Sequence, residues 1–465
     1  MNAARDGTPS LVPSETYHLI GIAGTGMSAL AQALLDRGAG VSGSDRFLDE
    51  GRKLPVLAVL EAAGARLFPQ DGSGVRASRP AAAIASGAVE EGNADLDAAR
   101  ACGVPVWHRS RALAALMAGR RPFAVAGTSG KTTVTGMLGW ILERAGLDPV
   151  VVNGGAVVNW RGTSRLGSVR HGHGAWFVFE ADESDRSLLA YEPAAAVLTN
   201  ISGDHFSLEE AVGLFRQFLE RVRGPVVVGP GVGQALGGGP ELIEPRPWPP
   251  PSAARGGVVF GLNGTRFEVP LPGEHNGWNA VLAASAAAVA GVDGQTAAAA
   301  LRDFRGIERR LERVGECNGA VVLDDYAHNP AKISAAWRAA GRMGAPVVGI
   351  WRPHGFGPLR KMMDDLVVEL GRVMGPGDAL VLLPVFYAGG TPSGAATSEE
   401  LAERLEAAGW RAETVADAPA AAARARELAR PGGVVLVMGA RDPDLPRLAR
   451  WIAAPSRFDS GATGR

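Results

Sequence analysis

The sequence predicts an α/β protein of three domains, each containing a doubly wound sheet. The chain has 465 residues, and a domain usually takes about 150 residues. Short apolar runs alternate with longer helical patterns along most of the chain, which is the order that builds parallel sheets. Glycine-rich turns follow two of these runs, near residues 24 and 127, and such turns indicate sites for phosphate groups.

The composition limits the class of protein. A formal net charge of −1 argues against a protein that coats nucleic acid, which would be strongly basic. Two cysteines, Cys102 and Cys317, cannot form a disulfide framework. The first residues lack a signal pattern, and no apolar run approaches the roughly 20 residues of a membrane span. We therefore expect a cytoplasmic monomer or weak dimer, with no nucleic-acid or membrane partner.

The first domain is predicted over residues 1–118, with a glycine turn near its start. An apolar strand leads to the pattern G-x-G-x-x-A from Gly24, which opens a helix running to about residue 37. Asp45 follows about 20 positions later, so the segment fits a Rossmann-like dinucleotide fingerprint. This turn binds any pyrophosphate, so the residues leave three interpretations open: a sugar nucleotide, NAD, or a tight turn without a ligand.

The central domain, predicted over residues 119–313, begins with a phosphate cradle. A buried strand at 123–126 meets the turn G-T-S-G-K-T-T at 127–133, and a helix follows. Turn amides and the helix N-terminus supply positive dipoles, Lys131 supplies a charge, and the Thr132 hydroxyl can ligate Mg²⁺. A strict P-loop has glycine at the position of Val125. An ordinary turn is the alternative, but the order of strand, glycines, lysine and helix favours a P-loop-type ATPase domain.

Two further strands of this domain end in polar residues. Glu180 closes an apolar strand and is followed by Asp182, Glu183 and Asp185. The carboxyl edge of an open parallel sheet is where ligands bind, so Glu180 is a candidate Mg²⁺ ligand, although a solvated acidic loop is the plainer alternative. The strand at 194–200 leads to His205, which is either a second metal ligand or a structural histidine.

The remaining segments include one without assignable chemistry. Residues 229–257 are rich in glycine and proline and are predicted to form a flexible surface excursion. His275 and Asn279 stand four apart at the start of an alanine-rich helix, on one face, where they can contact a base or a ribose. Residues 314–465 again alternate strands and helices and are predicted to form a second Rossmann-like domain.

Taken in order, these motifs resemble the Mur ligase family over nearly the whole chain. The motifs are G-T-G-M-S at 24–28, G-S-D at 43–45, the cradle at 127–133, E-A-D-E-S-D at 180–185, T-N at 199–200 with D-H at 204–205, P-G-E-H-N at 272–276, R-R at 309–310 and D-D-Y-A-H at 324–328. The resemblance implies an ATP-dependent ligase of peptidoglycan precursor synthesis. Its first domain would hold UDP-N-acetylmuramate, its second Mg-ATP, and its third an amino acid, most simply L-alanine.

The resemblance also implies roles for single residues. The catalytic set would be Lys131, Glu180, His205 and His328, with Thr132, Glu180 and His205 as Mg²⁺ ligands. ATP would be contacted by Gly127, Thr128, Ser129, Gly130, Lys131, Thr132, Thr133, His275, Asn279 and Arg310. The UDP-sugar would be contacted by Gly24, Thr25, Gly26, Met27, Ser28, Asp45 and Ser86, and the acceptor by Tyr326 and His328.

The acceptor region departs from the family pattern. Alanine-adding members carry Pro-His-Arg-Tyr-Ser-Arg after the second strand of the last domain, and its two arginines face the acceptor's carboxylate. Here residues 353–358 read P-H-G-F-G-P, and a carboxylate in a closed site needs a cationic partner. Arg360 and Lys361 are the first candidates, with Arg352 and Arg441 in reserve. A short peptide, such as a murein tripeptide, or another amino acid is the alternative acceptor.

Two rival functions belong to other classes. An NAD-type oxidoreductase is supported only by the fingerprint from Gly24 to Asp45, and it leaves the cradle unexplained. A non-catalytic nucleotide-binding protein of the same fold is the other. Against it, each phosphate and metal position that can be matched holds a chemically competent residue.

Overall fold

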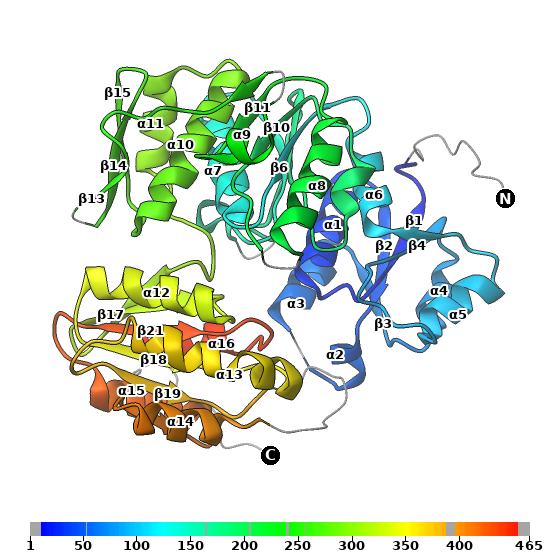
Figure 1. Cartoon of the computed structure of the whole chain (residues 1–465). Coiled ribbons are helices and arrows are strands. Elements are labelled where there is room, and N and C mark those ends of the chain that lie inside the picture. Colours follow the sequence, from blue (N-terminus) through cyan, green and yellow to red (C-terminus); the bar gives the residue numbers. More distant parts are fainter. Residues whose placement is uncertain are drawn as a thin grey trace. The chain divides into compact units, whose positions relative to one another are not determined.

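The computed structural model describes residues 11–52, 54–162, 165–203, 206–238, 241–254, 256–386 and 396–453. The chain divides into two compact units, Met1–Gly306 and Ile307–Arg465. The described residues form four sheets, of which three are largely parallel and covered by helices (Figure 1). The predicted α/β class is confirmed.

The first sheet is parallel throughout, with the strand order β3-β2-β1-β4-β5. This is the order of a doubly wound sheet, whose ligand crevice lies where the strand order reverses beside β1. The strands are β1 (Thr16–Ile20), β2 (Gly40–Ser44), β3 (Arg66–Phe68), β4 (Ala82–Ala85) and β5 (Val106–His108). The helices are α1 (Thr25–Asp36), α2 (Arg46–Asp49), α3 (Pro55–Ala62), α4 (Ser73–Ser78), α5 (Ala94–Ala101) and α6 (Arg109–Leu116).

The central sheet has the order β12-β11-β10-β6-β9-β7-β8 and is parallel except for β8. Its strands are β6 (Arg121–Ala126), β7 (Val150–Val152), β8 (Val169–Arg170), β9 (Trp176–Glu180), β10 (Ala195–Leu198), β11 (Val226–Val228) and β12 (Leu242–Ile243). Its helices are α7 (Lys131–Arg144), α8 (Leu208–Leu219), α9 (Val232–Ala235), α10 (Glu274–Val289) and α11 (Gly294–Arg302), with short 3₁₀ turns η1 (Val158–Trp160) and η2 (Ser187–Ala190).

Helix α7 is buried along most of its length, because α10 and α11 pack against it (Figure 1). The Trp140 indole N–H donates to the carbonyl of Ala300 at 2.8 Å, which ties α7 to α11. The packing of α10 on α7 also brings Asn279, in the second turn of α10, next to Gly130 at the start of α7.

The glycine- and proline-rich segment differs from its prediction. We expected a flexible excursion over 229–257, but the segment includes α9, β12 and β13 (Ser252–Ala254). Strand β13 pairs with β14 (Gly257–Leu262), which pairs with β15 (Thr265–Val269) in a small antiparallel sheet. The Trp248 N–H donates to the carbonyl of Gly261, and the Gly261 N–H donates to that of Pro249. A proline has no N–H to donate, but its carbonyl can still accept a hydrogen bond. The proline-rich residues 247–251 can therefore pair along the edge of this small sheet.

The second unit contains one six-stranded sheet in the order β16-β17-β21-β18-β19-β20, parallel except for β16. Its strands are β16 (Glu312–Cys317), β17 (Ala320–Asp325), β18 (Val347–Trp351), β19 (Ala379–Leu382), β20 (Ala412–Thr414) and β21 (Val434–Met438). One face is covered by α12 (Pro330–Met343), α13 (Phe356–Gly371) and α14 (Ser398–Ala407), and the other by α15 (Ala418–Leu428) and α16 (Leu445–Ala453).

One of the two predicted domain boundaries falls between elements of the structure, and the other falls within a strand. The boundary after residue 118 falls in the connection between α6 and β6, whereas the one after residue 313 falls inside β16. The chain separates into two compact units. The predicted boundaries of three domains therefore stay a prediction. Among the described helices, none combines the length and the hydropathy needed to cross a membrane.

Candidate active site

The predicted cradle is a strand–turn–helix in the structure. Strand β6 ends at Ala126, and α7 begins at Lys131. Gly127 and Gly130 have φ angles of 122° and 86°, in the left-handed region that side chains disfavour. A Cβ on Gly127 would also lie 2.1 Å from Thr199 Oγ1. Glycine is therefore required at position 127, where a side chain would clash with Thr199.

Two residues from the end of β10 fix the shape of this turn. The Thr199 hydroxyl donates to the carbonyl of Ser129 at 2.7 Å, and the Asn200 amide donates to the same carbonyl at 2.8 Å. The Ser129 N–H donates back to Asn200 Oδ1 at 3.1 Å. Sequence reasoning gave these two residues no role. Their signal was present, because they follow a strand predicted to end at the same sheet edge as the cradle.

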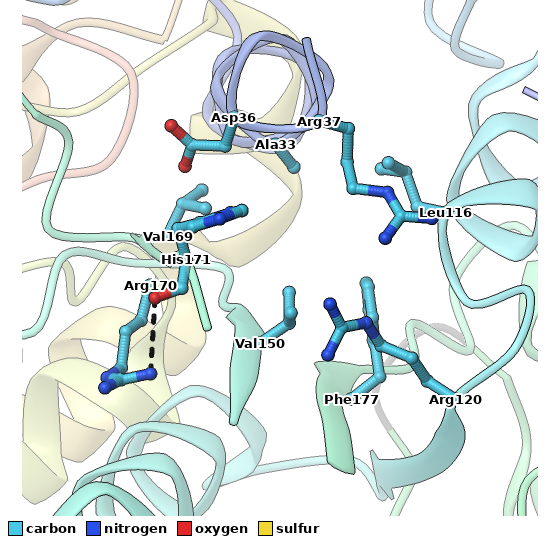
Figure 2. A pocket seen from close by; sticks show the side chains of 10 residues that line it. All are labelled: Ala33, Asp36, Arg37, Leu116, Arg120, Val150, Val169, Arg170, His171 and Phe177. Atoms are coloured by element: carbon cyan, nitrogen blue, oxygen red, sulfur yellow. Dashed lines mark hydrogen bonds between the residues drawn. The ribbon is translucent and has the colours of Figure 1, made fainter. Parts of the chain in front are cut away.

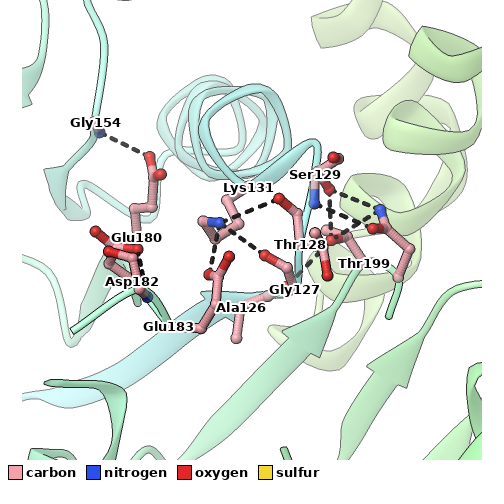
Figure 3. A network of polar contacts seen from close by, with 12 residues as sticks. Ala126, Gly127, Thr128, Ser129, Lys131, Gly154, Glu180, Asp182, Glu183 and Thr199 are labelled. Atoms are coloured by element: carbon pink, nitrogen blue, oxygen red, sulfur yellow. Dashed lines mark hydrogen bonds and ion pairs between the residues drawn. The ribbon is translucent and has the colours of Figure 1, made fainter. Parts of the chain in front are cut away.

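Lys131 lies over the turn and is held by a carboxylate. Its Nζ donates to the Gly127 carbonyl and to Glu183 Oε2, both at 2.7 Å (Figure 3). The two side chains are 12% and 6% exposed, so the ion pair is shielded from water. Burial raises the pKa of Glu183, while the neighbouring ammonium group works in the opposite direction. Lys131 is therefore already engaged by Glu183 in this structure.

Glu180 and Thr132 are brought to the same sheet edge. Glu180 ends β9, which pairs with β6 so that Glu180 stands opposite Val125. Its Oε2 accepts a hydrogen bond from the Gly154 N–H at 3.0 Å. Thr132 is in the first turn of α7 and 7% exposed. His205, the third predicted metal ligand, lies outside the described residues, and within them no cluster of three or more acidic, histidine or cysteine side chains is arranged to hold a metal.

Helix α10 brings one predicted ATP contact to the cradle. A Cβ on Gly130 would lie 2.5 Å from Asn279 Oδ1, so Asn279 lies against the turn. Its Nδ2 donates to Asn276 Oδ1 at 3.3 Å. His275 is in the first turn of the same helix. Thr128 and Thr133 are buried in and beside the turn.

In the first domain, Gly24 ends the connection from β1 and caps α1, whose first turn holds Thr25, Gly26, Met27 and Ser28. Asp45 supports this connection from the end of β2. One of its carboxylate oxygens accepts from the Ala23 N–H at 2.9 Å and the other from the Phe47 N–H at 3.1 Å. The side chain is 5% exposed, and burial raises the pKa of Asp45. The structure thus gives Asp45 a bracing role.

Two hollows of different size occur in the first unit. Ser86 follows β4 and lines a cavity of about 260 Å³, together with Leu96, Trp107 and His108. Figure 2 shows the other, between α1 and the edge of the central sheet, with Arg37 and Arg120 on its wall. Its volume is about 10 Å³, which is room for a single water molecule. Of these two cavities, the one at Ser86 is large enough for part of a substrate.

In the second unit, three predicted acceptor residues and His354, which was not predicted, lie at the carboxyl ends of three neighbouring strands. Tyr326 and His328 follow β17, His354 follows β18, and Arg441 follows β21, which lies between them. The rings of His328 and His354 are 5.5 Å apart, and Tyr326 packs edge-on against His328 at 5.7 Å. Burial lowers the pKa of His328 to about 4 and also lowers the pKa of His354, with Arg441 adding to the shift.

The other predicted acceptor cations are placed less favourably. Arg360 on α13 donates to Glu400 at 2.8 Å, and Arg404 donates to the same carboxylate at 2.9 Å. Arg352 donates to Asp442 at 2.7 Å. Lys361 is exposed on α13. Arg310, the predicted ATP contact, lies over the Tyr326 ring with its guanidinium carbon 5.4 Å from the ring centre.

Three family descriptions match successive parts of the chain. "Mur ligase family, catalytic domain" matches residues 16–121, "Mur ligase middle domain" matches 125–210, and "Mur ligase, glutamate ligase domain" matches 309–441. The chain belongs to the Mur ligase family. It is therefore an ATP-dependent ligase that forms amide bonds, and the NAD-oxidoreductase alternative is wrong.

Similar proteins cover nearly the whole of this Mur ligase. UDP-N-acetylmuramate–L-alanine ligase of Gloeobacter violaceus is 36% identical, over 96% of this chain and 98% of that protein. The enzyme of the same name from Streptomyces coelicolor is 36% identical, over 91% and 94%. The crystal structure of MurC, the UDP-N-acetylmuramate-alanine ligase of Thermotoga maritima, has a TM-score of 0.77 at 24% identity, over 95% and 99%. A murein peptide ligase from Psychrobacter arcticus has a TM-score of 0.67 at 23% identity, over 94% and 98%.

Removing the lysine of the cradle tests its role. Lys131→Ala should lower substrate-dependent phosphate release by roughly 100-fold or more, the size of effect seen when one fixed charge-stabilising donor is lost. The circular dichroism spectrum should be unchanged, since Lys131 is not part of an apolar core. Arg144→Ala, at the exposed last turn of the same helix, is the matched control and should retain normal turnover. If Lys131→Ala kept most of its activity, the cradle would be merely structural.

Proposed function

We propose that this Mur ligase joins L-alanine to the carboxylate of UDP-N-acetylmuramate, in the synthesis of peptidoglycan precursors. The observation that carries the proposal is the buried, carboxylate-held Lys131 over a glycine turn, in a chain whose full length matches alanine-adding relatives. The cradle supports activation of a carboxylate by ATP. The names of the similar proteins support UDP-N-acetylmuramate and L-alanine as the two substrates that are joined.

The chemistry follows from charge. A carboxylate is a poor acylating agent, so one of its oxygens first attacks the γ-phosphorus of ATP, giving an acyl phosphate and ADP. The amine of the amino acid then attacks the acyl carbon, a proton is lost from nitrogen, and phosphate leaves. The first step brings two anions together. Lys131 and the N-terminus of α7, which begins at Lys131, would neutralise part of that charge.

The residues present suit a magnesium ion, which is part of the proposal. Mg²⁺ prefers oxygen ligands and keeps several waters, and the Glu180 carboxylate and the Thr132 hydroxyl supply two oxygens at one sheet edge. Glu180 is held in place by the Gly154 N–H. A bound Mg²⁺ would offset charge on the phosphates. His205 is proposed as a further ligand on the family resemblance alone.

For the first domain we propose a UDP-sugar site at the turn of residues 24–28 and in the cavity at Ser86. Both oxygens of Asp45 accept main-chain hydrogen bonds. The acidic residue that would bind a nicotinamide cofactor's ribose hydroxyl is therefore already engaged. The cavity of about 260 Å³ contains the Trp107 ring, a flat surface on which a base can stack.

For the acceptor we propose a site formed by Tyr326, His328, His354 and Arg441. A pKa of about 4 makes the His328 imidazole neutral at pH 7, and burial lowers the pKa of His354 in the same direction. The cation for the acceptor's carboxylate must therefore be another side chain, and we propose Arg441. Arg360 is less suitable than we expected, because it is already paired with Glu400. A second candidate function is the attachment of a short murein peptide, favoured by Gly355 and Gly357, where alanine-adding members carry an arginine or a larger side chain.

An acceptor panel distinguishes these two functions. Phosphate release should be measured with ATP, Mg²⁺, UDP-N-acetylmuramate and one acceptor at a time: L-alanine, other amino acids, and the tripeptide L-Ala-γ-D-Glu-diaminopimelate. We expect turnover with L-alanine, and Arg441→Ala should raise the KM for it by roughly tenfold or more, because the charged partner is lost. If only the tripeptide supports turnover, the acceptor is the peptide and the proposal of L-alanine is wrong. If neither supports turnover, both proposed acceptors are wrong.

The proposed metal ligand is tested through the magnesium requirement. Glu180→Gln removes the negative charge and keeps the shape, so the Mg²⁺ concentration for half-maximal turnover should rise by roughly tenfold or more. Glu192→Gln is the control, since this exposed residue only pairs with Arg223 on the surface. An unchanged magnesium requirement in Glu180→Gln would remove Glu180 from the ligand set.

A further inference from the structure

The acidic residues that follow β9 pair with two cations from two different helices, Arg109 of α6 and Lys131 of α7. We call residues 182–185 the acidic loop. Glu183 holds Lys131 of the cradle at 2.7 Å. Asp182 and Asp185 instead hold Arg109, whose Nη2 lies 3.3 Å and 3.2 Å from their Oδ2 atoms. Four residues of chain thus contact both the phosphate lysine and a guanidinium group from the first sheet.

Arg109 also lies against the glycine turn of the first sheet. It is the first residue of α6, directly after β5, and its Nη1 is 3.0 Å from where a Cβ on Gly26 would lie. The neighbouring His108 adds a second contact, with Nε2 3.8 Å from Asp185 Oδ2. Any anion bound at the turn of residues 24–28 therefore meets the same guanidinium group that the acidic loop holds.

The acidic loop is braced from within. The Ser184 N–H donates to Asp182 Oδ1 at 3.1 Å, and the Ser187 N–H donates to Asp185 Oδ1 at 2.9 Å. The Arg186 N–H donates to the carbonyl of Glu183 at 2.9 Å. Because these bonds link neighbouring residues, a shift of Asp182 or Asp185 displaces Glu183 as well.

The ion pairs that the acidic loop makes with Arg109 and with Lys131 are partly shielded from water. Arg109 is 27% exposed, as is Asp185, and Lys131 and Glu183 are less exposed still. Fully exposed ion pairs contribute little, but charge-assisted hydrogen bonds with restricted access to water are stronger. Competition for Arg109 by an anionic ligand would therefore change the position of the acidic loop at a measurable energetic cost.

We propose that Arg109 is a positioning residue that couples the two substrate sites. An anionic sugar nucleotide at the glycine turn draws Arg109 away from Asp182 and Asp185. The acidic loop then loosens its hold through Glu183, and Lys131 becomes available to the phosphates of ATP. Sugar nucleotide and ATP thus bind with positive cooperativity. This inference rests on the proposed UDP-sugar site of the first domain.

The test is calorimetric and does not depend on turnover. The dissociation constant of a non-hydrolysable ATP analogue with Mg²⁺ is measured with and without saturating UDP-N-acetylmuramate. In the natural protein the sugar nucleotide should tighten binding by at least about fivefold, the lower end of typical coupling between sites. In Arg109→Ala, and independently in the Asp182→Asn/Asp185→Asn double variant, this factor should fall below about twofold. Arg109→Lys should show partial coupling, because it keeps the charge but not the forked geometry.

The controls separate this inference from the function on which it rests. Arg223→Ala removes an exposed ion pair with Glu192 and should retain the full coupling factor. Binding of the ATP analogue alone shows that each variant is folded. If both ligands bind and Arg109→Ala keeps the natural coupling, or if the natural protein shows none, Arg109 has no such role. If the natural protein binds the ATP analogue but no UDP-N-acetylmuramate, the proposed function itself fails, and the coupling with it.

Discussion

The constraint on which the proposed chemistry depends is the meeting of two anions, a carboxylate and a triphosphate. Neither can approach the other unless positive charge is already in place. The glycines at 127 and 130 give the turn its left-handed backbone, Thr199 and Asn200 hold the turn in shape, and Lys131 adds a positive charge. The Glu183 carboxylate holds that ammonium group in a buried position.

Much of this could be predicted from the sequence, because it is encoded locally. The cradle, the strand that ends at Glu180 and the glycine turn near residue 24 each follow from short patterns whose backbone requirements are strict. The alternation of strands and helices predicted the α/β class for the same reason. The glycine- and proline-rich segment was predicted less well, since its main-chain pairing with β14 is not visible in its composition.

The sequence did not show which charged side chains pair with one another. Four acids in six residues gave no indication that Glu183 would meet Lys131 while Asp182 and Asp185 meet Arg109. Arg360 was a sound acceptor candidate until Glu400, from a helix far along the chain, proved to be its partner. Asp45 followed the dinucleotide pattern in sequence, yet its oxygens brace the turn. These contacts depend on tertiary packing, which a local pattern does not contain.

The central claim is that the cradle activates the carboxylate by transferring a phosphoryl group to it. It is tested most directly with UDP-N-acetylmuramate carrying ¹⁸O in both carboxylate oxygens, and with mass spectrometry of the phosphate released during ligation. If an oxygen of the carboxylate attacks the γ-phosphorus, one labelled oxygen must leave with the phosphate, while the other remains in the amide carbonyl. Unlabelled phosphate, formed alongside normal amounts of amide product, would contradict the account.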